Sequence, residues 1–181
     1  ILKASEERAG VYRIDNVKYA GYLLEPGADL VRAGSSLYLW NTALQETRMW
    51  VFTDAGDGYV YWHPKKDLTL ALEGGGSGAN VEIQNKGDVD AQKWKIVKDE
   101  STGNFRIQNK ESGLYVGTEG DNNYALVKMR ESSAETTLWV MKELEATITL
   151  ELGASYIQAG GTTEVTVAAK DGSGAPLTKG I

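Results

Sequence analysis

The segment Ala91-Gln92-Lys93-Trp94 contains the second of three tryptophans that recur at nearly equal intervals along the chain. Trp94 lies 44 residues after Trp50 and 45 residues before Trp139. Each of these residues closes a similar stretch, in which a strand-like run, a turn, another run and a polar loop follow one another. Self-similarity at a fixed period indicates that one structural unit has been copied.

Each copy contains four short apolar runs, and the last of them includes the closing tryptophan. The third run of every copy begins 13 residues before that tryptophan. Most runs are bounded by Gly, Asn, Asp or Pro, which is typical of β-strands. The sequence therefore predicts twelve strands. The second runs of the three copies are Tyr22–Leu24, Leu68–Leu70 and Leu114–Val116.

Composition indicates a folded all-β protein. The 181 residues suffice for one domain of about 150 residues and a remainder. Apolar residues make up 41% of the chain, which supports a packed core, and the 21 glycines suit a fold dense in turns. Cysteine is absent, so disulfides and thiolate metal sites are excluded.

The charge pattern argues against two classes of partner. The formal net charge is −6, and no run of Lys or Arg occurs. Nucleic acid and anionic membrane surfaces both require clustered cations, so neither is expected as a partner. No apolar run approaches the roughly 20 residues that span a bilayer, so membrane insertion is not expected.

The pattern changes along the chain and predicts three parts: a lead-in at 1–10, the repeats at 11–145, and a tail at 146–181. Residues 147–152 and 163–168 alternate between apolar and polar side chains, which predicts the first two strands of a β-sandwich. A tail of about 35 residues cannot bury a core alone. We therefore expect the chain to be a piece of something longer; alternatively, the tail docks on the repeats or on another chain.

Two repeat architectures have this period. A β-propeller typically needs four to eight blades, so three copies are too few. Three four-stranded units can instead close as a six-stranded barrel that is capped by three hairpins around a pseudo-threefold axis. Closure covers the strand edges, which removes an aggregation liability of open sheets.

These residues resemble a known family. Ala91-Gln92-Lys93-Trp94 matches the Gln-x-Trp signature of ricin-type β-trefoil lectin domains, and Arg48-Met49-Trp50 and Thr137-Leu138-Trp139 resemble degenerate copies. The resemblance covers residues 10–145 and implies an all-β β-trefoil. The run from Ala159 to Pro176 resembles the start of a bacterial Ig-like domain, which implies a partial β-sandwich. We predict that the closing tryptophans are core residues and that Gln92 is a hydrogen-bonding residue between strand and loop.

The resemblance also implies where a sugar would bind. In this family each lobe can supply an Asp after its second strand, an aromatic residue at the end of its third strand, and an Asn near the Gln-x-Trp. The Asp is missing from all three lobes, because its position falls on Leu24, Ala71 and Gly117. The aromatic position falls on Trp40, Gln84 and Met129, and the Asn position falls on Thr47, Ala91 and Thr136.

The first lobe is therefore the best candidate, because Trp40 keeps the aromatic ring. Glu25, Glu73 and Glu119 lie near the missing Asp positions, but a strand neighbour points to the opposite face. Instead of binding sugar, Trp40 could be an aromatic ring that a neighbouring loop half covers. The alternative to sugar binding for Tyr59–Trp62 is packing between strands. The predicted carbohydrate-binding residues are Tyr38, Trp40, Asn41 and Glu25 in the first lobe, Gln84 and Asn85 in the second, and Asn123 and Tyr124 in the third.

Catalysis is not expected in this segment. His63 is the only histidine, no Ser lies in a nucleophile motif, and the Gly74–Gly78 loop lacks the Lys of a phosphate-binding loop. We predict no catalytic residue, no metal site and no cofactor.

The resulting hypothesis is a non-catalytic carbohydrate-binding module of a larger secreted, bacterial glycan-processing protein, located extracellularly, at the cell surface or in the periplasm. Its partners would be carbohydrate and its own downstream domains. The alternative is a structural or protein-interaction β-trefoil with vestigial sugar sites. A trefoil-type protease inhibitor is a third, weaker reading.

Overall fold

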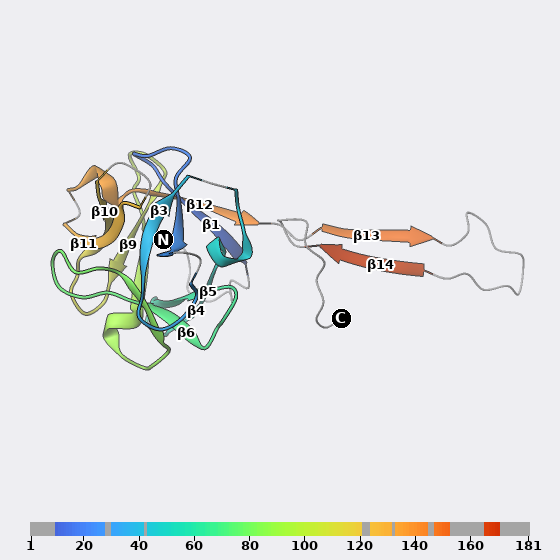
Figure 1. Cartoon of the computed structure of the whole chain (residues 1–181), viewed down its shortest axis with the longest axis horizontal. Coiled ribbons are helices and arrows are strands. Elements are labelled where there is room, and N and C mark those ends of the chain that lie inside the picture. The colour runs from blue at the N-terminus through green and yellow to red at the C-terminus, as the bar shows by residue number, and fades with distance from the viewer. Residues whose placement is uncertain are drawn as a thin grey trace, which may run out of the picture. The chain divides into compact units, whose positions relative to one another are not determined.

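The computed structural model describes residues 10–27, 30–41, 43–120, 124–131, 133–144, 147–152 and 165–170. The chain divides into two compact units, Ile1–Glu143 and Leu144–Ile181. The first unit is built from short strands with 3₁₀ turns between some of them, and its described residues contain no α-helix (Figure 1).

Twelve strands occur in three groups of four among the residues described up to Leu144. The first group is β1 (Val11–Asn16), β2 (Leu23–Pro26), β3 (Ser35–Trp40) and β4 (Trp50–Asp54). The second is β5 (Val60–Pro64), β6 (Leu70–Glu73), β7 (Glu82–Asn85) and β8 (Lys93–Lys98). The third is β9 (Phe105–Asn109), β10 (Tyr115–Glu119), β11 (Leu126–Arg130) and β12 (Trp139–Leu144). A 3₁₀ turn precedes the last strand of each group: η2 (Glu46–Arg48), η3 (Asp90–Gln92) and η4 (Glu135–Thr137).

The first and last strands of the three groups close a six-stranded antiparallel barrel. The pairs run β1–β4, β4–β5, β5–β8, β8–β9 and β9–β12, and β12 returns to β1. A closed sheet leaves no edge for another chain to pair with. The predicted fold of twelve strands and a six-stranded barrel is therefore confirmed.

The second and third strands of each group form hairpins that cap the barrel. These hairpins are β2–β3, β6–β7 and β10–β11. They also pair with one another through β3–β7, β3–β11 and a bridge between Asn80 and Lys128. The cap is thus continuous, and side chains from different lobes lie beside one another in it.

The closing tryptophans form the core, as predicted. Trp50, Trp94 and Trp139 are all fully buried. Trp62 is fully buried as well and packs edge-on against Trp50 and Trp94, with ring centroids 5.7 and 6.0 Å away. Within the aromatic run Tyr59–Trp62, Trp62 therefore has the role of strand packing.

The buried amide of Gln92 connects η3 to the hairpin of its own lobe. Its Oε1 accepts a bond from the Gly87 backbone N–H at 2.8 Å. Its Nε2 donates to the Glu73 carboxylate at 2.9 Å and to the Asn85 carbonyl at 3.0 Å. The predicted role of Gln92, a hydrogen-bonding residue between strand and loop, is confirmed.

One predicted strand starts two residues too early. We expected the second strand of the second lobe to begin at Leu68, but β6 begins at Leu70. The Asp67 carboxylate accepts bonds from both the backbone N–H and the hydroxyl of Thr69, at 2.9 and 2.6 Å. An Asp side chain that bonds two residues ahead holds a turn, so Leu68 lies in that turn and is exposed.

The only histidine is buried in the barrel wall. The Nδ1–H of His63 donates to the Leu70 carbonyl at 2.6 Å, and its Nε2 accepts from the Thr53 hydroxyl at 2.8 Å. Burial is the main cause that lowers the pKa of His63 from its ordinary 6.5, with a smaller contribution from the nearby charge of Lys86. The folded state therefore favours the neutral form of the His63 imidazole.

This burial predicts how stability depends on pH. Because the pKa of His63 is lower in the folded state, the unfolded chain takes up its proton first as the pH falls below 6.5. The free energy of unfolding should therefore be steady above that pH and decrease below it, towards the lower folded pKa. We expect His63→Gln to remove this part of the slope, which urea denaturation at several pH values would measure. A His63 NMR titration with a midpoint at or above 6.5 would contradict the prediction.

The second unit contains a two-stranded antiparallel sheet among its described residues. β13 (Thr147–Leu152) pairs with β14 (Val165–Lys170) over all six positions (Figure 1). β13 has the predicted bounds, and β14 begins two residues after the predicted start. No helix in the described part of the chain is long and apolar enough to cross a membrane.

Candidate functional site

The hairpin register corrects the alignment of the lobes. The Cα pairs Leu24–Leu39, Leu72–Ile83 and Val116–Met129 are equivalent, since their third-strand members all lie at the same distance, within one residue, before the closing tryptophan of their lobe. The residues that follow on the second strand of each lobe are therefore also equivalent: Glu25, Glu73 and Gly117. A one-residue shift moves a side chain to the other face of a strand. The prediction that the acidic position falls on Leu24 and Ala71 was wrong, and two lobes have a Glu there.

Both of these carboxylates bind groups of their own lobe. Glu25 is only 3% exposed, and its Oε2 lies 2.7 Å from Nε of the equally buried Arg48. Glu73 accepts the hydrogen bond from Gln92. Arg48 and Gln92 occupy the same place, two residues before the closing tryptophan. We therefore assign Glu25 a structural role and omit it from the proposed ligand-binding set.

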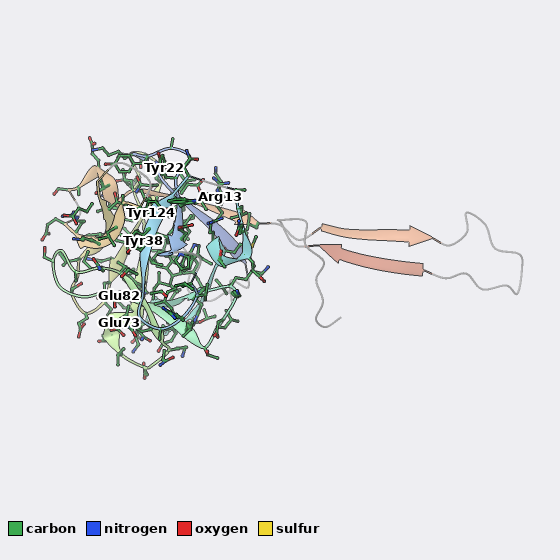
Figure 2. All side chains as sticks on the ribbon, in the orientation of Figure 1. Arg13, Tyr22, Tyr38, Glu73, Glu82 and Tyr124 are labelled. Atoms are coloured by element: carbon green, nitrogen blue, oxygen red, sulfur yellow. The ribbon has the colours of Figure 1, made fainter. Side chains whose placement is uncertain are left out.

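An open depression of about 660 Å³ lies between the first and third lobes. The connection between β2 and β3 supplies most of its described wall, β3 itself supplies Ser35, Ser36 and Tyr38, and Tyr124, just before β11, completes it. β3 and β11 are adjacent strands, with Leu126 opposite Tyr38, so these two lobes meet here. Figure 2 shows Tyr38 and Tyr124 together near β3. The lining residues that bear on ligand binding are Gly27, Leu30, Arg32, Ser36, Tyr38 and Tyr124.

Tyr124 has an unusual backbone conformation. Its φ is 68°, in the left-handed region, while the equivalent residues of the other lobes are glycines, Gly34 at 84° and Gly78 at 77°. The equivalence follows from three matching backbone hydrogen bonds in the cap. They are Gly34 N to Ile83 O at 2.8 Å, Gly78 N to Met129 O at 3.0 Å, and Tyr124 N to Leu39 O at 2.9 Å. A left-handed backbone costs roughly 1–2 kcal/mol for a residue with a side chain, so the third lobe carries a strained tyrosine where glycine would fit freely.

The Tyr124 ring is presented to solvent on an aromatic support. Tyr124 is 63% exposed, and its ring centroid lies 4.0 Å from that of Trp40, at an interplanar angle of 59°. Trp40 is half-buried and does not line the depression itself. Two residues predicted in different lobes thus meet, and Trp40 is partly covered by a neighbouring loop residue.

The Tyr38 ring lies close against the backbone of the loop. A Cβ atom at Gly27 would come within 2.7 Å of Tyr38 Cε2, so only glycine leaves room for the ring in this position. Tyr38 is half-buried and pairs across the hairpin with Glu25. Glu25, which forms the buried ion pair with Arg48, therefore lies in the strand next to that of the ring.

The other predicted residues lie outside the depression. Asn41 is exposed directly after β3. Gln84 donates to the Glu82 carboxylate at 3.2 Å, and Asn85 is exposed and binds Gln92 through its carbonyl. Asn123 falls outside the described residues. The second-lobe candidates are therefore separate from the site formed by Tyr38 and Tyr124.

Sequence reasoning missed the polar residues Arg32, Ser35 and Ser36 of the depression. The Ser36 hydroxyl donates to the Glu82 carboxylate of the second lobe at 3.3 Å. Arg32 is exposed and contributes the charged side chain among the described lining residues. The loop around Arg32 has no motif that marks it, so the sequence offered no signal. No cluster of three potential metal-binding side chains occurs in the part of the chain that the structure describes.

Comparison with known proteins identifies the architecture. Residues 90–176 match the model of a family described as ricin-type beta-trefoil lectin domain-like. The designed threefold-symmetric protein ThreeFoil superposes with a TM-score of 0.66 at 22% identity, over 73% of this chain and 97% of its own. The fold is a β-trefoil. No curated protein matches the chain.

Two natural proteins have the same trefoil within longer chains. The Polyporus squamosus lectin, bound to the human-type influenza-binding epitope, has a TM-score of 0.65 at 16% identity, over 77% of this chain and 50% of its own. The exo-β-1,3-galactanase 1,3Gal43A from Clostridium thermocellum has a TM-score of 0.65 at 17% identity, over 75% of this chain and 30% of its own. At these identities the likeness shows the fold, and this chain spans half or less of either protein.

Proposed function

We propose that the trefoil is a non-catalytic carbohydrate-binding module and that its ligand occupies the depression formed by Tyr38 and Tyr124. Sugar recognition needs an aromatic face for the C–H side of a pyranose and a few fixed polar groups for its hydroxyls. Two tyrosine rings, Arg32 and the Ser36 hydroxyl supply both at one place. The ricin-type family match and the lectin among the neighbours support this assignment.

The strained Tyr124 is the observation that carries the proposal. Strained backbone conformations that persist in a fold cluster at functional sites. Glycine at this position, as in the other two lobes, would relieve the strain. The tyrosine instead places an exposed ring beside the depression, and ligand stacking is the role that this arrangement fits.

We expect Tyr124→Gly to separate binding from stability. Relief of the left-handed backbone offsets the lost ring contact with Trp40, so the free energy of unfolding should stay within about 1 kcal/mol of the parent. Glycan binding should weaken about tenfold, which corresponds to about 1.4 kcal/mol. A glycan array, followed by calorimetry on the best ligand, measures the second effect. Tyr38→Ala should weaken the binding of the same glycans by a similar factor.

Two further variants make the result interpretable. Tyr124→Asn removes the ring but keeps a residue that tolerates the left-handed region. Leu68→Ala removes an exposed apolar side chain outside the depression and should leave binding unchanged. If both tyrosine variants bind glycans as the parent does, the ligand does not occupy this depression.

A specific observation also favours a second function. Glu25 and Glu73, at the acidic position of two lobes, both bind groups of their own lobe rather than facing an open site. This is the pattern expected of a structural or protein-interaction trefoil with vestigial sugar sites. A glycan array that stays blank for the folded parent protein would favour this alternative.

We further propose that the module belongs to a larger secreted bacterial protein that processes glycans outside the cell, at its surface or in the periplasm. The galactanase, in which the matching region is only 30% of the chain, offers a precedent for this arrangement. A tethered module of low affinity raises the local concentration of a catalytic partner at polysaccharide. Removal of the trefoil should then lower the activity of such a protein on insoluble polysaccharide but not on small soluble substrates.

A further inference from the structure

We propose that the depression selects acidic sugars, namely pyranoses that carry a carboxylate, and that Arg32 determines this preference. The inference rests on the proposed function and concerns the same site. It adds the charge class of the ligand, which neither the fold nor the aromatic rings specify.

Arg32 differs from the other described arginines in having no acidic partner. Within the described residues every other arginine forms an ion pair, whereas Arg32 forms none. The four pairs are Arg13–Asp15 at 2.6 Å, Arg48–Glu25 at 2.7 Å, Arg106–Asp99 at 3.4 Å and Arg130–Glu119 at 3.7 Å. In a chain with a net charge of −6, an arginine without such a partner is unusual, because carboxylates outnumber the cations.

The backbone around Arg32 fixes where its side chain starts. The Arg32 N–H donates to the Leu30 carbonyl, and the Arg32 carbonyl accepts from the Ser35 N–H at 3.2 Å. Ser35 begins β3, so the arginine is held one turn before a strand of the cap. The backbone of Arg32 is thereby held at the wall of the depression, on the connection that leads into the strand of Tyr38.

The neighbouring acidic group is already engaged. Glu82, across the β3–β7 pair from Ser36, accepts hydrogen bonds from the Ser36 hydroxyl and from Gln84 Nε2, at 3.3 and 3.2 Å. The described lining residues contain no carboxylate. An anionic ligand would therefore meet one cation and no like charge among these residues.

The chemistry of this set fits a carboxylate sugar. A guanidinium is a planar fork that binds a carboxylate through two parallel hydrogen bonds. The rings of Tyr38 and Tyr124 can hold the apolar face of the pyranose while Arg32 takes the acid at its edge. Because Arg32 is exposed, its pairing with a ligand should be modest and sensitive to salt.

The experiment compares sugars that differ only in the acid. The probes are oligosaccharides that end in glucuronic or galacturonic acid and their partners that end in glucose or galactose. They are tested on the full chain and on two variants, Arg32→Gln and Lys66→Gln. Lys66→Gln is the matched control, because it removes one exposed positive charge that does not line the depression. Sulfated galactose is a separate arm that distinguishes a carboxylate from a sulfate ester.

We expect the parent to bind a uronic-acid glycan about five- to tenfold more tightly than its neutral partner at low salt. Arg32→Gln should lower the affinity for the uronic-acid glycan to that for its neutral partner, whereas Lys66→Gln should keep the preference. Equal binding of acidic and neutral sugars, with no effect of Arg32→Gln, would overturn the inference and leave the proposed function intact. Preference for the sulfate ester alone would overturn the carboxylate assignment. If the parent protein binds no glycan at all, the proposed function itself is overturned.

Discussion

Replacing Trp94 with alanine is expected to lower the free energy of unfolding by about 3–5 kcal/mol, because the variant leaves a large cavity in the core. Trp94 is fully buried, and its Nε1 donates to the Leu72 carbonyl at 3.0 Å. A Cβ atom at Gly74 would lie 2.7 Å from the tip of the indole, so the ring packs directly on backbone. Because backbone cannot move into the cavity as a side chain could, the loss in free energy of unfolding should lie at the upper end of this range.

The pseudo-symmetry of the fold provides a sharper comparison. The indole N–H of Trp139 donates to the Val116 carbonyl at 2.8 Å, as that of Trp94 does to Leu72, but Trp50 Nε1 has no hydrogen-bond partner among the described residues. Replacing any of the three tryptophans with phenylalanine removes its indole N–H. Only in the second and third lobes does this leave a buried carbonyl without its hydrogen bond. Trp94→Phe and Trp139→Phe should therefore cost about 1–2 kcal/mol more than Trp50→Phe.

Urea denaturation at a constant m-value measures these differences. Leu68→Ala, at an exposed position of the second lobe, serves as the control and should stay within about 0.5 kcal/mol of the parent. A Trp94→Ala variant as stable as that control would show that the indoles do not form the common core of the three lobes.

The architecture could be predicted from sequence because its signal is local and repeated. Three tryptophans at one period, each preceded by short strand-like runs, indicated twelve strands and a threefold barrel. Their burial follows from the same observation, since a large apolar residue that recurs once per copy fits a shared core. These inferences needed only a pattern within each lobe and its recurrence along the sequence, and no contact between lobes.

The register of the second strands could not be read with the same accuracy. Apolar residues at both Leu68 and Leu70 allow either start, and the choice depends on the Asp67 carboxylate, which holds the turn through Thr69. The acidic position was placed one residue too early in the first lobe and two residues too early in the second, and an offset of one residue already changes the face of a strand. For this reason Glu25 and Glu73 were placed beside the acidic position rather than at it.

The candidate site itself depends on contacts between lobes. Tyr124 meets Trp40 because β11 pairs with β3 in the cap, and no pattern within either lobe encodes that pairing. The strain at Tyr124 becomes visible only when its φ is compared with those of Gly34 and Gly78. The lack of an acidic partner for Arg32 is likewise a three-dimensional property. The residues that distinguish this trefoil are those in which the copies differ, and sequence repeats emphasise what the copies share.

The buried ion pair between Arg48 and Glu25 carries the second large effect. Arg48→Met is expected to lower the free energy of unfolding by about 3–5 kcal/mol, because it removes the cation that pairs with a buried carboxylate. The variant also removes the bond from Arg48 Nη1 to the Ala43 carbonyl, which is 2.8 Å long. Both charged side chains are only 4% exposed, so solvent cannot replace the lost partner.

The double variant Glu25→Leu/Arg48→Met should recover most of that loss, because apolar residues of similar size can replace a buried pair at little cost. Since Glu25 lies opposite Tyr38 in the hairpin, the same variant tests whether the carboxylate touches a ligand. We expect the double variant to unfold near the parent's urea midpoint and to bind the same glycans, because the Glu25 carboxylate is engaged by Arg48 and its residue is only 3% exposed. If the double variant keeps its stability but loses glycan binding, Glu25 contacts the sugar. The ion pair with Arg48 would then position a binding residue, in addition to stabilising the first lobe.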